Sequence, residues 1–219
     1  MAEHPDGTAF PPLAEPPSGG GWALAAPLLR AAFKALNRWF MLPAHRVGLG
    51  PWVSTPLGGW ILVLRVRGRK SGRMRDTPLN YLIEDGAVWV MAGFGRRTEW
   101  YRNLLADPAV EVRLPGRRFA GTAEEILDPA VRARVIPRLV RATGLPGTMV
   151  VPAPWIAPDE DVLDATGFVP LVRIRMRDGS ALEAGPDDPG GRAWIWRQAV
   201  VMAVALAGWR LATAIRRGG

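Results

Sequence analysis

A short basic stretch between two apolar runs is the part of the sequence best suited to binding chemistry. Three cationic residues and a serine lie around two glycines in Gly68-Arg69-Lys70-Ser71-Gly72-Arg73. The glycines allow a sharp turn and a close approach to a ligand, while lysine supplies a point charge and arginine a forked donor for phosphate or carboxylate. The stretch predicts an anion-binding turn, with a solvated basic hairpin tip as the alternative.

A second stretch with related chemistry follows further along the chain. The glycines of Gly93-Phe94-Gly95 would let a flat ring lie close to the backbone. Arg96 and Arg97 then precede a helix predicted from Thr98 to Ala106, with Thr98 as its N-cap. Free amides at the start of this helix, beside the two cations, make a second anion-binding locus. Two such loci on one sheet suit one long anionic ligand.

Two side chains of this predicted helix each have two interpretations. Trp100 can face a ligand or pack in the core, which is the usual role of buried aromatic residues. Asn103 can hydrogen-bond either the basic turn or a ligand.

Strands that would position these stretches are predicted on either side of them. Apolar residues run through 60–67, and 73–83 forms a second extended run in which Pro78 favours an edge position or a bulge over a central strand. Glu84-Asp85-Gly86 predicts a hairpin turn before a third strand at 87–91. Further strands are predicted at 110–114, 117–126 and 168–177, the last of which would close a barrel.

Helices are predicted outside this barrel at 27–41, from Asp128 to about 144, and at 193–215. Pro137 is expected to bend or break the middle helix, whose arginines are expected to face solvent. After that helix, residues 145–166 are expected to form a surface loop that lines the substrate pocket. The acidic residues of this loop lack the spacing of a calcium-binding loop.

The order of these motifs resembles the deazaflavin (F-420)-dependent nitroreductase and quinone reductase family. The resemblance covers roughly residues 40–127, and several linked motifs in one order are more specific than any one of them. Besides the basic turn they are Thr77-Pro78-Leu79-Asn80-Tyr81, Ala92-Gly93-Phe94-Gly95, Glu99-Trp100-Tyr101-Arg102-Asn103-Leu104 and Asp107-Pro108. The family implies an α+β fold, a split β-barrel that is FMN-binding-like and mostly antiparallel, with flanking helices and, here, extra N- and C-terminal helices.

The resemblance also implies a function and a set of site residues. The function is hydride transfer from a reduced deazaflavin, coenzyme F-420, to a quinone-like or nitroaromatic acceptor. The cations would bind the phosphodiester and oligoglutamate tail of the coenzyme, and its ring would lie against residues 91–95 and near Trp100. The predicted cofactor-binding residues are Arg69, Lys70, Ser71, Gly72, Arg73, Arg75, Pro78, Met91, Ala92, Gly93, Phe94, Arg96, Arg97, Trp100, Tyr101 and Asn103.

Fewer residues are candidates for catalysis. The better-known nitro-reducing members carry tyrosines after the long helix, whereas residues 145–166 contain none here. Tyr81 and Tyr101 are the two tyrosines of the chain and are the predicted catalytic residues. A lipophilic, menaquinone-like quinone is the hypothesis for the acceptor. The alternatives are a split barrel that binds FMN, haem or lipid, and a membrane-surface binding protein without this chemistry.

Composition narrows the classes of partner. The net charge of +8 is carried almost entirely by arginine, since Lys34 and Lys70 are the two lysines. This excess suits an anionic partner, and nucleic acid ranks last because no nucleic-acid-binding motif occurs. The absence of cysteine excludes disulfides and thiolate catalysis. His4 and His45 are too few for a histidine-rich metal site, so no metal is predicted.

The two ends of the chain differ from its middle. Residues 1–21 predict a disordered tail without signal-peptide features, 22–42 an amphipathic N-terminal helix, 43–184 the split-barrel cofactor-binding domain, and 192–217 an apolar C-terminal helix. The uncharged run 198–209 is shorter than the ~20 residues that span a bilayer. The end helices are therefore expected either to pack on each other or on a second subunit, as in a homodimer, or to contact a membrane peripherally. The expected location is cytoplasmic, with any such contact on the cytoplasmic face of the membrane.

Overall fold

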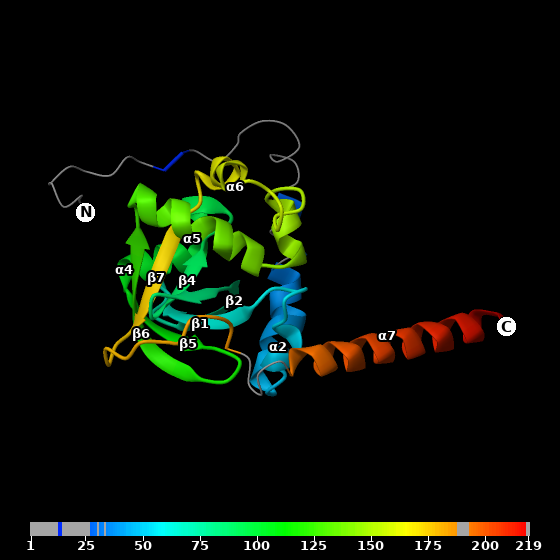
Figure 1. Cartoon of the computed structure of the whole chain (residues 1–219). Coiled ribbons are helices and arrows are strands. Elements are labelled where there is room, and N and C mark those ends of the chain that lie inside the picture. The colour runs from blue at the N-terminus through cyan, green and yellow to red at the C-terminus, as the bar shows by residue number, and fades with distance from the viewer. Residues whose placement is uncertain (1–12, 15–26, 30, 33, 188–192, 218–219) are drawn as a thin grey trace, which may run out of the picture.

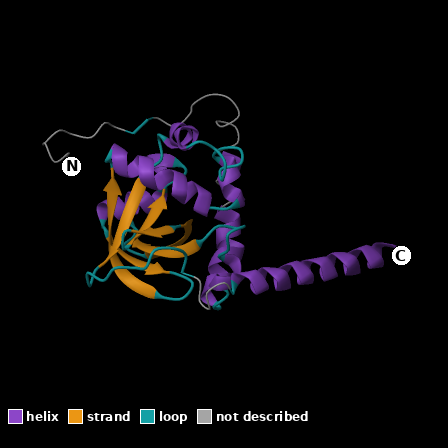
Figure 2. Ribbon diagram, viewed as in Figure 1, coloured by secondary structure: helices purple, strands orange, loops and turns teal. Residues whose placement is uncertain are grey.

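The structure, a computed structural model, describes residues 13–14, 27–29, 31–32, 34–187 and 193–217. A curled sheet is flanked by helices, and a long C-terminal helix projects away from this body (Figures 1 and 2). The strands are β1 (Ile61–Arg67), β2 (Met74–Asn80), β3 (Leu82–Glu84), β4 (Ala87–Met91), β5 (Ala109–Arg113), β6 (Arg118–Ile126) and β7 (Leu171–Met176). The helices are η1 (Asn37–Met41), α2 (Leu42–Arg46), α3 (Gly50–Val53), η2 (Gly95–Arg97), α4 (Glu99–Ala106), α5 (Pro129–Ala142), η3 (Leu145–Met149), α6 (Asp159–Thr166) and α7 (Trp194–Arg217).

The strands form one 7-stranded sheet in the order β2-β1-β5-β6-β7-β4-β3. All neighbouring strands are antiparallel. β2 and β3 lie at opposite ends of this order, yet only Tyr81 separates them in the chain. The two ends of the sheet must therefore meet, and β2 does contact β4. This curling makes a split β-barrel, so the predicted fold class is confirmed.

Every second side chain of β1 points into the barrel interior. Leu62, Leu64 and Val66 of β1 are fully buried in the interior core, whereas Arg67 at the end of the strand is exposed. Pro78 lies in β2, which is an edge strand as predicted, because a proline has no N–H to donate to a further strand.

A second core lies between the sheet and the helix that follows β6. Asp128 accepts a hydrogen bond from the backbone N–H of Ala130 at 2.8 Å, which caps the start of α5. Buried side chains of α5, among them Val135 and Leu139, pack against Trp89 of the sheet. Pro137 is buried inside α5, which continues through it as a single helix to Ala142, so the predicted break is wrong.

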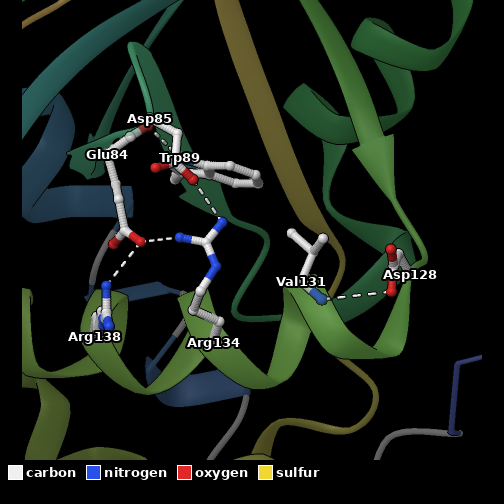
Figure 3. Close-up of polar contacts among 7 residues, drawn as sticks. All are labelled: Glu84, Asp85, Trp89, Asp128, Val131, Arg134 and Arg138. Carbon is white, nitrogen blue, oxygen red and sulfur yellow. Dashed lines mark hydrogen bonds and ion pairs between the residues drawn. The ribbon is translucent and has the colours of Figure 1, made fainter.

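The arginines of α5 do not simply face solvent as predicted: Arg132 is buried and donates to the Val169 carbonyl, and Arg134 and Arg138 bind acidic residues (Figure 3). Arg134 donates to Glu84 and to Asp85, and Arg138 donates to Glu84 at 2.8 Å. Asp85 and Gly86 both have positive φ, 53° and 72°, as the predicted hairpin turn requires. The contacts tie the tip of the β3–β4 hairpin to α5.

The segment 145–166 also differs from its prediction as a surface loop. It forms η3 and α6, and it buries Val151 and Val162 against α5 in the second core. Its acidic residues Asp159, Glu160 and Asp161 make the first turn of α6, where negative charge is favourable. In the described part of the chain, no three or more metal-binding side chains gather in a way that could hold an ion.

The N-terminal helix is longer than predicted. Residues 27–29, 31–32 and 34–36 are helical and lead through η1 into α2, so the helix continues past 41. Its side chains Leu28, Trp39 and Phe40 are exposed. The predicted tail at 1–21 lies outside the described residues, apart from Leu13 and Ala14.

α7 touches the body mainly near its start. Trp196 meets Trp52 of α3 edge to face, with ring centroids 5.2 Å apart. The helix then projects from the body with its apolar side chains exposed (Figure 1). None of the helices in the described ranges has the length and apolarity needed to cross a membrane.

Candidate functional site

The basic turn between β1 and β2 is tightly closed by its own backbone. Gly68 N–H donates to the carbonyl of Arg73 at 2.9 Å, and Gly72 N–H donates to the carbonyl of Gly68 at 2.8 Å. Gly72 has a φ of +64°, a conformation that favours glycine. A Cβ at Gly68 would lie 3.0 Å from the Ser71 hydroxyl oxygen and 3.1 Å from the Arg73 carbonyl oxygen, so the turn leaves little room for a side chain there.

Helix α4 holds one residue of this turn in place. The Asn103 side-chain oxygen accepts hydrogen bonds from the Arg69 backbone N–H at 3.2 Å and from its guanidinium at 2.8 Å. The same guanidinium donates to Glu99 at 2.8 and 3.3 Å. Of the two predictions for Asn103, the structure therefore supports the bond to the turn.

Glu99 is a site residue that the sequence prediction missed. The hydrogen bond from Arg69 lowers the pKa of the Glu99 carboxyl from its ordinary value, so this carboxylate stays ionised beside the basic turn. It is separated from Arg69 by 30 residues in the chain, and no local spacing pattern relates positions so far apart.

The remaining cations of the turn have no carboxylate partner. Lys70, Arg73 and Arg75 are exposed and make no ion pair with any described residue. Arg97, which ends η2 just before α4, is likewise exposed and unpaired within the described part. Arg96 differs, because it donates to Glu125 of β6 at 2.9 Å. Four of the six predicted cations are thus free to bind an anion.

The glycine-rich segment 92–95, here called the glycine shelf, directly precedes η2 and α4. Gly93 is exposed, and a Cβ built on it would meet no atom within 4 Å. Its backbone is outside the left-handed region that favours glycine, so neither packing nor conformation of the protein alone requires a glycine here.

The start of α4 differs from its prediction in one detail. The Thr98 hydroxyl donates to the carbonyl of Gly95 at 2.8 Å, and it accepts no hydrogen bond from the helix amides. Thr98 is therefore the N-cap residue of α4, as predicted, but its side chain does not cap the helix. The first amides of α4 lack a side-chain cap beside Arg97, a combination that favours an anion.

Both predicted catalytic tyrosines lie in the barrel core. Tyr81 is 1% exposed, and its hydroxyl accepts a hydrogen bond from the Asp187 N–H at 3.0 Å. Tyr101 is 0% exposed, and its hydroxyl has no hydrogen-bond partner within range among the described residues. Burial, with a smaller contribution from Glu125, raises the pKa of Tyr101 far above its ordinary value. In this conformation neither phenol reaches solvent, so a catalytic role for either would require the core to open.

The predicted cofactor-binding residues divide by exposure. Trp100 is 6% exposed and packs in the barrel core, which was one of its two predicted roles. The residues open to solvent are Lys70, Ser71, Gly72, Arg73, Arg75, Gly93, Arg96 and Arg97. The partly buried residues are Arg69, Met91 and Phe94, and the buried ones are Pro78, Ala92, Trp100, Tyr101 and Asn103.

The two loci meet at the first turn of α4. Glu99 of that turn binds the basic turn through Arg69, while the glycine shelf and Arg97 lead directly into the same turn. These features define a class of protein, a split β-barrel with free cations and an open glycine shelf at the start of one helix.

Comparison with known proteins identifies the family within this class. The family model described as F420H(2)-dependent quinone reductase matches residues 45–144, which include both loci. Rv3178 of Mycobacterium tuberculosis, whose name also places it among these reductases, is 34% identical over 89 residues, covering 70% of that protein and 37% of this chain. This chain belongs to the F420H(2)-dependent quinone reductase family.

Other similarities are more limited. The F420H(2)-dependent quinone reductase Rv1261c of M. tuberculosis is 35% identical over 68 residues, which cover 30% of this chain and 46% of that protein. This match thus spans about half the length of that relative. Among solved structures, an F420-H2 dependent reductase aligns with a TM-score of 0.38 at 23% identity, over 52% of this chain and 93% of the other. This structural similarity is too weak to support any conclusion beyond the topology described above.

Proposed function

We propose that this chain is an oxidoreductase that binds reduced coenzyme F420 and transfers a hydride from it to a quinone. The observation that carries the proposal is the group of unpaired cations in the β1–β2 turn, in β2 and just before α4, within the segment that matches the reductase family. The coenzyme and the quinone are those in the printed names of the relatives.

The residues present fit this coenzyme in two respects. Its anionic groups need cations that are not already in an ion pair, and within the described residues Lys70, Arg73 and Arg97 form none. Its flat ring needs backbone without side chains, which describes Gly93. Arg69 has a structural role instead, because its guanidinium donates to Asn103 and Glu99 and so links the turn to α4.

The protein contributes binding, orientation and charge, and the bound coenzyme supplies the hydride. A quinone gains negative charge as it accepts the hydride, so the positive potential of the unpaired cations favours its reduction. Because Tyr81 and Tyr101 are buried, we propose that water supplies the proton that completes the reduction.

Gly93→Val tests this function. Its side chain would project into the open space over the glycine shelf, so we expect coenzyme binding and quinone-dependent oxidation of the reduced coenzyme to be lost. The melting temperature should stay the same because nothing in the protein lies within 4 Å of the added Cβ. Binding is measured by coenzyme fluorescence and turnover by the absorbance of the reduced coenzyme with menadione as acceptor.

Gly208→Val is the matched control, because a Cβ at Gly208 on α7 also meets no atom within 4 Å. It should bind and turn over as the wild-type protein does. Wild-type protein that oxidises no reduced coenzyme above background, or a Gly93→Val variant with unchanged binding, would contradict the proposal. Titration with FMN in parallel tests the alternative cofactor, and tight FMN binding without F420 binding would replace the proposed coenzyme.

We propose, as a second component of the function, that α7 contacts a lipid surface. Val200, Val201 and Met202 are consecutive and all exposed, and consecutive helical residues lie on different faces. A helix that is apolar all round suits surrounding lipid, whereas one partner helix would cover a single stripe. The α7 sequence contains no acidic residue, which suits anionic lipid headgroups. Such a contact would bring the protein to a lipophilic quinone.

The double variant Val204→Glu and Leu206→Glu tests this component, since both side chains are exposed and their replacement should leave the fold intact. We expect wild-type protein to sediment with vesicles of phosphatidylglycerol and the variant to remain in the supernatant. Val47→Glu, also at an exposed apolar position, is the control. Equal partitioning of wild type and variant would refute lipid contact. A concentration-dependent dimer abolished by the variant would instead assign α7 to a homodimer interface.

A further inference from the structure

A cavity of about 290 Å³ lies outside the barrel core, between the α2–α3 segment and the β5–β6 hairpin. Val63 forms part of its lining and lies on the face of β1 opposite Leu62 and Leu64 of the interior core. None of the residues proposed to bind the coenzyme lines this cavity. Its size suits a small organic molecule rather than a whole coenzyme.

The lining of the cavity is both apolar and basic. Leu42, Val63 and Leu114 supply apolar surface. Of the lining arginines, two are committed, since Arg113 lies 2.9 Å from Glu111 and Arg117 lies 3.1 Å from Asp187.

The other two lining arginines, Arg46 and Arg118, are available. Arg118 is exposed and has no ion pair with any residue that the structure describes. Arg46 is 65% exposed and reaches Asp76 only at 3.9 Å. Asp76 also lines the cavity, but it already accepts two hydrogen bonds from Arg65, at 2.7 and 3.3 Å, so Arg65 takes up most of its charge and it neutralises Arg46 poorly. The rim of the cavity therefore carries uncompensated positive charge.

The ring of His45 lines the cavity and has one buried polar atom, Nε2, without a hydrogen-bond partner in the described part of the chain. The ring packs closely on Gly50, where an added Cβ would lie 2.8 Å from His45 Nδ1. Buried polar atoms without partners are rare and unfavourable, and they often mark a place where a ligand or water binds.

We propose that this cavity is a second binding site, which takes a small organic anion with a carboxylate attached to an apolar ring or chain. The apolar part would cover Leu42, Val63 and Leu114, and the carboxylate would pair with Arg46 and Arg118. An inorganic anion would leave the apolar side chains of the lining exposed to water. A neutral molecule would leave the two guanidinium groups unpaired, so an organic anion suits the cavity better than either. The site is independent of the proposed coenzyme site.

Titration of the full-length protein followed by NMR of the His45 ring protons tests the proposal. The protein has only one other histidine, His4, so the His4→Gln variant assigns the signal. The probes are benzoate, its neutral analogue benzamide, and acetate, which has the charge without the ring. We expect benzoate to shift the His45 signal saturably at one site, acetate to bind more weakly, and benzamide to have no effect.

Arg118→Ala should weaken benzoate binding by roughly tenfold, because one charge-assisted contact is lost. Arg46→Ala is the second variant, and Arg210→Ala, an exposed arginine on α7, is the control that should change nothing. Binding of F420 should be the same in all three variants. The proposal is overturned if benzoate causes no saturable shift, if all three probes act alike, or if both arginine variants bind benzoate as the wild type does.

Discussion

Replacement of both Lys70 and Arg73 by alanine is expected to weaken binding of F420 by about 3 kcal/mol, roughly a hundredfold. A hydrogen bond to a charged group contributes about 1.5–3 kcal/mol, and exposed contacts fall at the lower end of that range. Both side chains are exposed and form no ion pair in the described part of the protein, so both can bind the ligand directly. The measurement is a fluorescence titration of the coenzyme at fixed ionic strength.

The same double variant should unfold at the same denaturant concentration as the wild type, within about 0.5 kcal/mol, because surface substitutions without specific contacts have small effects. Arg210→Ala removes an equally exposed arginine on α7 and should leave coenzyme affinity unchanged. Wild-type affinity in the Lys70 and Arg73 double variant would show that the basic turn is not the anion site. The affinity of the wild type should also fall as salt is added, more steeply than that of the variant.

Arg69 should respond differently from its two neighbours in the turn. Because Asn103 and Glu99 hold its guanidinium, its removal also releases contacts between α4 and the turn. Lys70 and Arg73 are therefore the cleaner test of ligand binding, since their loss leaves the turn itself intact.

Gly144→Ala is expected to destabilise the protein by about 3–5 kcal/mol, the range of substitutions that combine backbone strain with a steric clash. Gly144 follows α5 with φ +64° and ψ −142°, a conformation nearly restricted to glycine. A Cβ there would lie 2.4 Å from the backbone oxygens of both Pro56 and Leu57. The loop that contains Pro56 and Leu57 would have to move. This movement would strain the 2.8 Å hydrogen bond from Leu145 N–H to the Leu57 carbonyl.

Gly58→Ala is the control for this prediction, because Gly58 lies in the same loop as Pro56 and Leu57. Its φ is not in the left-handed region, and its added Cβ would make ordinary contacts, the nearest at 3.5 Å. Chemical denaturation of both variants measures the difference in the free energy of unfolding. Similar free energies of unfolding for Gly144→Ala and Gly58→Ala would contradict the close approach of Gly144 to the backbone of Pro56 and Leu57.

Local patterns in the sequence predicted the elements that need only local information. Pro78 identified an edge strand because a proline lacks the N–H that a further strand would need. Glu84-Asp85-Gly86 identified a hairpin because the turn requires positive φ at two adjacent positions. Alternation of apolar residues and arginines identified β7, since side chains of a strand point to opposite faces in turn.

Predictions about individual side chains were less complete. Pro137 was expected to interrupt its helix, yet α5 continues through it. Helix propensity is a weak prior, and the apolar face of α5, including Val135 and Leu139, is buried in the second core. For Trp100 and Asn103 the sequence left two roles open each, and long-range packing decided between them.

The sequence by itself determined most of the strands, the turns and the grouping of cations in two short stretches, because residue type and local spacing control backbone conformation. The single extended run predicted at 73–83 is instead two strands, β2 and β3, at opposite ends of the sheet order. Only the tertiary structure decided which cations are free. Glu99 pairs with Arg69 and Glu125 pairs with Arg96, whereas Lys70, Arg73, Arg75 and Arg97 form no ion pair among the described residues. Charge pairing depends on distance in space, and the partners of Arg69 and Arg96 lie 30 and 29 residues away in the chain.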